Sequence, residues 1–149
     1  MKDEDIGAFD EGERSEGGIY TATVMWCEDP SAAKAQYGPI ASWDTSEITS
    51  METLFEDRAD FNGDISRWDV SSVTHMCYML NGATSFNGDL SQWNVSNVEG
   101  MGFMLYGATS FTHQLGGAWS TSTASKTGMF YNCPGSIAGK TKNANGTPV

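Results

Sequence analysis

The sequence is short of basic residues and contains no long hydrophobic run. Lys and Arg together number 8 against 19 Asp and Glu, so the formal net charge is -11. A nucleic-acid surface needs clustered Lys and Arg against phosphate, and we therefore expect no nucleic-acid partner. No stretch approaches the ~20 apolar residues that cross a bilayer, so the sequence predicts a soluble or peripheral protein without a membrane span.

Cysteine is also scarce. Cys27, Cys77 and Cys133 form no CxxC pair and have no Cys/His spacing typical of a metal site. We interpret all three as packed thiols and expect no cofactor. Residues 1–16 hold seven acids and two bases, the reverse of a signal or transit peptide. The alternative is that the chain is processed from a longer precursor and belongs to an organelle complex.

A repeat of 25 residues organises what is present. Residues 61–83 match residues 86–108 at fourteen of 23 positions. Four tryptophans mark the sequence units, the first three separated by 25 residues and the last by 26: Trp43, Trp68, Trp93 and Trp119. A fixed period of this length is the signature of stacked repeat architectures.

Each unit has two halves with different patterns. Val73, Met76 and Leu80 follow the three-and-four spacing of one helix face, which predicts a helix of about ten residues ended at Gly82. Residues 93–95 alternate as a short strand does. Neither element buries its apolar face alone, so we expect neighbouring units to stack.

We divide the chain into an acidic extended segment (1–16), an N-terminal cap (17–42), the repeats (43–138) and a tail (139–149). Residues 19–26 are ambiguous between helix and strand. Stacked units should place like residues in buried ladders. The predicted ladder residues are Trp43, Trp68, Trp93, Trp119, Met51, Met76, Met101, Phe61, Phe86 and Phe111.

The segments FNGDIS-x-WDVSSVT-x-M and FNGDLS-x-WNVSNV-x-x-M resemble the BspA-like leucine-rich repeats, a domain of unknown function first catalogued in mycoplasma surface proteins. The resemblance covers roughly residues 19–133. It implies an α/β repeat fold: a short right-handed leucine-rich-repeat-like solenoid of about four 25-residue coils, each a short strand plus a short helix, with an N-terminal cap. It also implies adhesion and protein binding, in bacterial surface proteins or unicellular eukaryotes including algae, with no shared catalytic residues.

Asp60, Asn62 and Asp64 place side-chain oxygens at alternate positions, as calcium loops do, but without the downstream Glu. Asn and Asp side chains also satisfy backbone amides at turns, and their recurrence in each unit favours that role. We therefore expect no obligatory metal, and calcium ligation is the alternative.

Residues that differ between units should lie outside and carry any binding specificity. The candidate partner-binding residues are Ile6, Phe9, Arg67, His75, Tyr78, Phe103, Tyr106, Lys140 and Lys142. Both terminal segments have few apolar residues, so we expect them to become ordered against a partner.

No nucleophile–base pair or paired carboxylate recurs, and we expect no enzyme. The sequence favours a non-catalytic protein-interaction or scaffolding module that binds protein partners within a larger assembly. One alternative is a small accessory subunit bound permanently in a larger complex, membrane-associated or algal. A second is a calcium-dependent surface adhesin.

Overall fold

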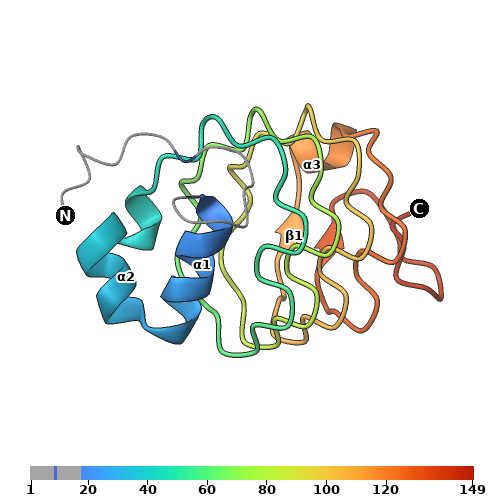
Figure 1. Cartoon of the computed structure of the whole chain (residues 1–149). Coiled ribbons are helices and arrows are strands. Elements are labelled where there is room, and N and C mark those ends of the chain that lie inside the picture. The colour runs from blue at the N-terminus through green and yellow to red at the C-terminus, as the bar shows by residue number, and fades with distance from the viewer. Residues whose placement is uncertain (1–8, 10–17) are drawn as a thin grey trace.

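The computed structural model describes residue 9 and residues 18–149, in which two helices lie at one end of a row of loops (Figure 1). Helix α1 spans Ile19–Glu28 and helix α2 spans Pro30–Tyr37. The ambiguous stretch 19–26 is therefore helical. Asp29 starts α2 by accepting a hydrogen bond from the Ala32 N–H at 3.1 Å, with Pro30 in the first turn.

The remaining regular elements are short. A 3₁₀ helix, η2 (Ile40–Ser42), leads into the first sequence unit. Strand β1 (Gln114–Leu115) pairs in parallel with β2 (Ser136–Ile137), and α3 (Ala118–Thr121) lies between them in the chain. β1 pairs Gln114 with Ser136 and Leu115 with Ile137.

The predicted right-handed, leucine-rich-repeat-like solenoid of four strand-plus-helix coils is wrong. Within the described residues the structure has three α-helices, one 3₁₀ helix and a single two-stranded sheet. Residues 43–113, which hold the best-matched sequence units, contain none of these elements. The expected helix at 73–83 is a succession of turns, and residues 93–95 form no strand.

Backbone conformation explains why no helix forms. Tyr78 and Gly82 have φ of 61° and 75°, and Phe103 and Gly107 repeat this with 58° and 75°. An α-helix requires φ near −60° at every residue. Left-handed residues four positions apart are therefore incompatible with a helix. The turns that replace it still bury apolar side chains three and four residues apart. The spacing that predicts a helix is therefore shared by these turns.

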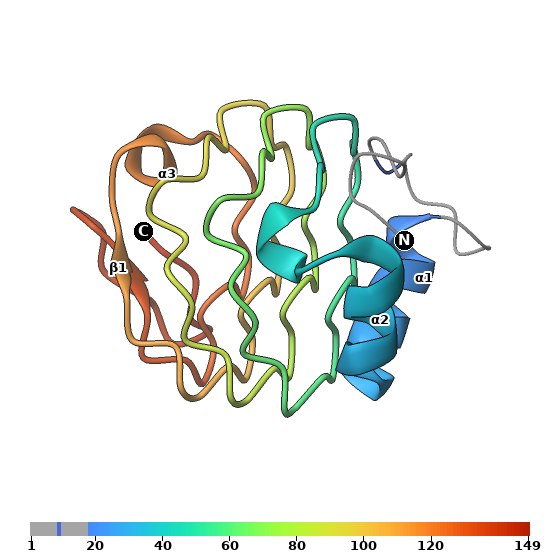
Figure 2. The same ribbon diagram turned by 90° about the vertical axis from the view of Figure 1, so that its left-hand side faces the viewer.

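Neighbouring sequence units lie side by side in parallel, as the adjacent loops of Figure 2 show. The N–H groups of Met76 and Leu80 donate to the carbonyls of Gly100 and Met104 at 2.8 and 2.9 Å. Intervening amides close local turns, so the backbone bonds alternate between neighbours and turns. Single parallel bridges also join the units in succession through Ser50, His75, Gly100 and Ser125.

Buried rings pack between the units. Trp43 and Trp68 stack at a centroid distance of 6.2 Å, and the Phe61 and Phe86 rings stack at 5.8 Å. Each indole N–H bonds to an earlier segment, for example from Trp68 to the Ile40 carbonyl at 2.8 Å. All the residues proposed for ladders are buried: Trp43, Trp68, Trp93, Trp119, Met51, Met76, Met101, Phe61, Phe86 and Phe111. We call them the buried columns.

Phe9 belongs to the core. Its side chain is 2% exposed, and its ring lies 5.1 Å from the Trp43 ring and 5.7 Å from the Tyr37 ring. Its N–H donates to the Asp44 carbonyl at 3.1 Å. The prediction that Phe9 contacts a partner is therefore wrong. Ile6 and the rest of the acidic segment lie outside the described residues.

The tail, 139–149, is bonded to the last unit. The Phe130 N–H donates to the Gly146 carbonyl at 2.9 Å, and the Gly128 N–H donates to the Thr147 hydroxyl at 2.8 Å. In the preceding unit, the equivalent N–H groups of Leu105 and Phe103 donate to carbonyls of the next unit. The tail therefore takes the place of a further unit. The expectation that the tail becomes ordered only against a partner is therefore wrong.

Candidate interaction surface

Four aromatic side chains form a row on the surface. The rings of Tyr78 and Phe103 stack at 5.1 Å, those of Phe103 and Tyr106 meet at 5.8 Å, and those of Tyr106 and Tyr131 stack at 5.0 Å. The exposed fractions of Tyr78, Tyr106 and Tyr131 are 39%, 37% and 43%. We call these four residues the aromatic row. Large exposed aromatics gathered in one patch are typical of binding surfaces.

Two members of the row occupy backbone positions that favour glycine. Tyr78 and Phe103 have φ of 61° and 58°, and Gly128 holds the equivalent position of the next unit with φ 65°. The left-handed conformation costs an L-residue about 1–2 kcal/mol, and a bulky residue there is a genuine outlier. The Phe103 ring covers Gly128 so closely that an added Cβ would lie 2.6 Å from Cε1. The backbone alone does not account for aromatic residues at these two positions.

The two ends of the row differ in charge. At the helical end, one unit before Tyr78, Thr53 holds the position equivalent to Tyr78 and Glu56 the position equivalent to Asn81. Asp57 comes directly after Glu56. The Thr53 N–H donates to the Cys77 carbonyl at 3.1 Å, which places this acidic segment directly beside the row. No acidic residue follows Glu99 in the sequence. The row therefore begins beside carboxylates and ends away from them.

Lys142 lies near the other end of the row but is bonded to its own chain. Its Nζ donates to the carbonyls of Cys133 and Gly135 at 2.8 and 2.7 Å, and lies 5.7 Å from the centre of the Phe130 ring. The ammonium group fixes the tail against the last unit. Its predicted role as a partner contact is therefore secondary to a structural one.

The structure brings together only some of the predicted binding residues. Tyr78, Phe103 and Tyr106 lie in the row, whereas Arg67, His75 and Lys140 are exposed but have no ring contact with it among the described residues. The His75 ring nitrogen Nδ1 lies 2.9 Å from the Thr74 hydroxyl. The sequence analysis missed Tyr131. Its place 25 residues after Tyr106 was the available signal.

The residues considered for calcium bond to the chain itself. The Asn62 side-chain oxygen accepts the Asn87 N–H at 2.9 Å, and Asp64 Oδ1 accepts the N–H and hydroxyl of Ser66 at 3.0 and 2.6 Å. The Ser66 hydroxyl and N–H lower the pKa of the Asp64 carboxyl. Asp60 is exposed. Over residues 18–149 and Phe9, no group of three or more His, Cys, Asp or Glu could hold a metal ion.

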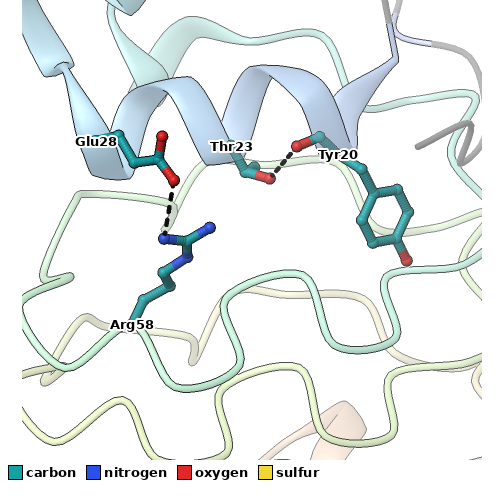
Figure 3. Close-up of polar contacts among 4 residues, drawn as sticks. All are labelled: Tyr20, Thr23, Glu28 and Arg58. Atoms are coloured by element: carbon teal, nitrogen blue, oxygen red, sulfur yellow. Dashed lines mark hydrogen bonds and ion pairs between the residues drawn. The ribbon is translucent and has the colours of Figure 1, made fainter. Parts of the chain in front are cut away.

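A cavity of about 450 Å³ lies between α1 and the first unit. Beside it, Arg58 forms an ion pair with Glu28 of α1 at 3.7 Å, as Figure 3 shows. Burial is the main cause that raises the pKa of the Cys27 thiol in its wall, so this thiol is poorly ionised. The lining contains neither His nor Ser.

A family model described as "Mycoplasma protein of unknown function, DUF285" matches residues 28–142. The chain belongs to this BspA-like family, and the family prediction is confirmed. No curated protein and no solved structure matches the chain. No helix within residues 18–149 has the length and apolar character needed to cross a membrane.

Proposed function

We propose that this protein is a non-catalytic protein-binding module whose docking surface is the aromatic row. The observation that carries the proposal is a connected row of four surface rings, three exposed and Phe103 half-buried, of which two lie on left-handed backbone where glycine is favoured. Tyrosine supplies large contact area and a hydroxyl at low entropic cost, and it is enriched among the residues that dominate binding energy.

The recurring polar groups support a non-catalytic role. Asp64, Asp69 and Asp89 each bind the serine two residues ahead, through its N–H or hydroxyl. Asn62 and Asn87 each accept a backbone N–H from the next unit. These bonds hold turns and neighbouring units together, so the oxygens that recur most regularly already serve the fold.

The two alternatives have weaker support. The calcium-dependent adhesin required free oxygens at Asn62 and Asp64, and both groups accept hydrogen bonds from the chain. The permanent accessory subunit relied on terminal segments that a partner orders, and the tail binds its own last unit instead.

The test is affinity capture from cells that produce the protein, using three purified baits. The row variant carries Tyr78→Gly, Phe103→Gly, Tyr106→Asn and Tyr131→Asn, which copy Gly128 or Asn81 from equivalent positions. The matched control carries Arg67→Gln and His75→Gly, which copy Gln92 and Gly100. We expect proteins that the wild type and the control retain and the row variant loses.

Two results would count against the proposal. Proteins retained equally by all three baits would move the docking surface away from the row. A wild-type bait that retains nothing beyond an unrelated protein of the same net charge would argue against a binding module.

A further inference from the structure

We infer that the aromatic row receives one face of an amphipathic α-helix from the partner, with aliphatic side chains on the rings and Lys or Arg at the end nearest Glu56. This inference rests on the proposed function and names the shape and charge of the partner. Three observations carry it: which parts of the rings are free, how far apart the rings lie, and where the carboxylates are.

One face of each ring is covered by its partner in a stack. Tyr78 and Phe103 stack with planes 15° apart, and Tyr106 and Tyr131 with planes 24° apart. Sugars bind aromatic residues by lying flat on a free ring face, and the stacking removes one of the two faces of each ring. Ring edges and tyrosine hydroxyls remain exposed, and these suit the mixed apolar and polar contacts of a protein surface.

The spacing of the rings fits a helix better than an extended chain. From one unit to the next the centroids advance by 5.1 Å for Tyr78 and Phe103 and by 5.0 Å for Tyr106 and Tyr131. The pitch of an α-helix is about 5.4 Å, so three successive turns can reach Tyr78, then Phe103 and Tyr106 of the next unit, then Tyr131. Same-face residues of a strand recur every ~6.6 Å, and those of a polyproline helix every ~9.3 Å. Both would lose register within two rings.

Charge sets the direction of the helix. Glu56 and Asp57 lie beside the Tyr78 end, and neither forms an ion pair within the described residues. At the Tyr131 end the neighbouring chain carries Lys142 and no acid. A helix with basic residues at one end only therefore binds in one orientation, with that end beside Glu56. Its apolar stripe follows the i, i+3, i+4, i+7 pattern of helix-in-groove recognition.

The probe is a display library of single helices of about 18 residues, with one face randomised and the rest Ala, Gln and Lys. Helices are selected on the wild-type protein. The best binders are then measured by fluorescence anisotropy against the wild type, the row variant and the Arg67→Gln/His75→Gly control, with circular dichroism to show that each variant is folded.

We expect selected helices with an aliphatic residue at each turn and excess Lys or Arg at one end. They should bind the row variant at least tenfold more weakly than the wild type and bind the control equally. Glu56→Gln with Asp57→Asn should weaken binding several-fold, and the loss should shrink at high salt.

Either of two outcomes overturns the inference. In one, selected helices bind the row variant as tightly as the wild type. In the other, no helix is enriched above an unrelated acidic protein. If helices fail while the captured partner of the preceding experiment still depends on the row, the row binds a protein of another shape and the proposed function stands.

Discussion

The buried columns and the aromatic row both contain rings that stack from one sequence unit to the next, but they differ in what surrounds those rings. Trp93 is 2% exposed and its indole N–H donates to the Ile65 carbonyl at 3.0 Å. Tyr78 is 39% exposed and has left-handed backbone. The Trp93 ring is packed on all sides and its N–H is hydrogen-bonded. The Tyr78 ring is packed only in part.

The difference separates residues that hold the fold from residues that the fold presents. Removing a buried ring leaves a cavity and an unpaired carbonyl. Replacing an exposed ring on left-handed backbone by glycine relieves the strain as it removes the contact. Truncation should therefore cost much stability in the buried columns and little at the left-handed positions of the aromatic row, although both look alike as sequence patterns.

The largest effect is expected for Trp68→Ala. Trp68 is 3% exposed, stacks on Trp43, and donates to the Ile40 carbonyl. The free energy of unfolding should fall by ~3–5 kcal/mol, as is usual for a truncated buried aromatic. Denaturant titration measures it, with the exposed Tyr106→Ala as control. A loss below ~1 kcal/mol would show that the buried columns do not carry the stability.

The sequence predicted the buried positions far better than the backbone that links them. Trp and Met recur at the same place in at least three successive units, as core residues of side-by-side units should, so Trp68 and Met76 could be placed without knowing the local structure. The helix at 73–83 could not be distinguished from turns, because both keep the same apolar spacing. Left-handed φ at Tyr78 has no signal in that residue, and only Gly128, two units later, could have indicated it.

Much of the candidate surface was accessible from the sequence, but the tail and Phe9 were misjudged. Tyr78, Phe103 and Tyr106 were found because they vary between units and should lie outside. The tail was misjudged because its contacts use carbonyl and hydroxyl groups at Gly146 and Thr147, which composition does not report. Phe9 was a lone aromatic in an acidic segment, and such a residue fits a partner or its own core equally well.

The next largest effect tests the tail at two left-handed glycines. Gly146 has φ 76°, and an added Cβ would overlap the Tyr131 backbone, whereas Gly139 has φ 82° and open space around it. Gly146→Ala should cost ~2–4 kcal/mol, because left-handed strain adds to overpacking. Gly139→Ala should cost only the strain, ~1–2 kcal/mol. Equal losses in thermal or denaturant unfolding would show that the tail does not pack on Tyr131.

A smaller effect is expected from the carboxylates of the turns. Hydrogen bonds from the serine two residues ahead lower the pKa of Asp64, Asp69 and Asp89 below the ordinary 3.8. A pKa lowered by folding stabilises the folded state above the unfolded pKa, and this contribution is lost as the pH falls through the folded value. Solvent exposure limits it to about a few tenths of a kcal/mol for each turn.

The measurement compares denaturant unfolding at pH 7 and near pH 2.5. The wild type should lose more stability on acidification than the triple variant Ser66→Ala, Ser71→Ala and Ser91→Ala. Ser120→Ala is the control, because its hydroxyl donates to the Ala138 carbonyl and to no carboxylate. If the triple variant and the wild type lose the same stability, these turns do not contribute to the pH dependence.

The smallest effect, and the sharpest contrast with Trp68→Ala, is expected for Tyr78→Gly. Loss of the stack with Phe103 should cost about 0.5–1.5 kcal/mol, and the added freedom of glycine in the unfolded chain about 0.5–1 kcal/mol. Release of the left-handed strain at φ 61° should return about 1–2 kcal/mol. These contributions nearly cancel, so the free energy of unfolding should change by less than ~0.5 kcal/mol while capture of the partner falls.

Tyr78→Ala separates the loss of the ring from the release of strain, because it removes the ring and keeps the left-handed strain. It should be less stable than Tyr78→Gly by about 1 kcal/mol. A Tyr78→Gly variant as damaged as Trp68→Ala would make the aromatic row part of the core, and the proposed division between the two stacks would be wrong.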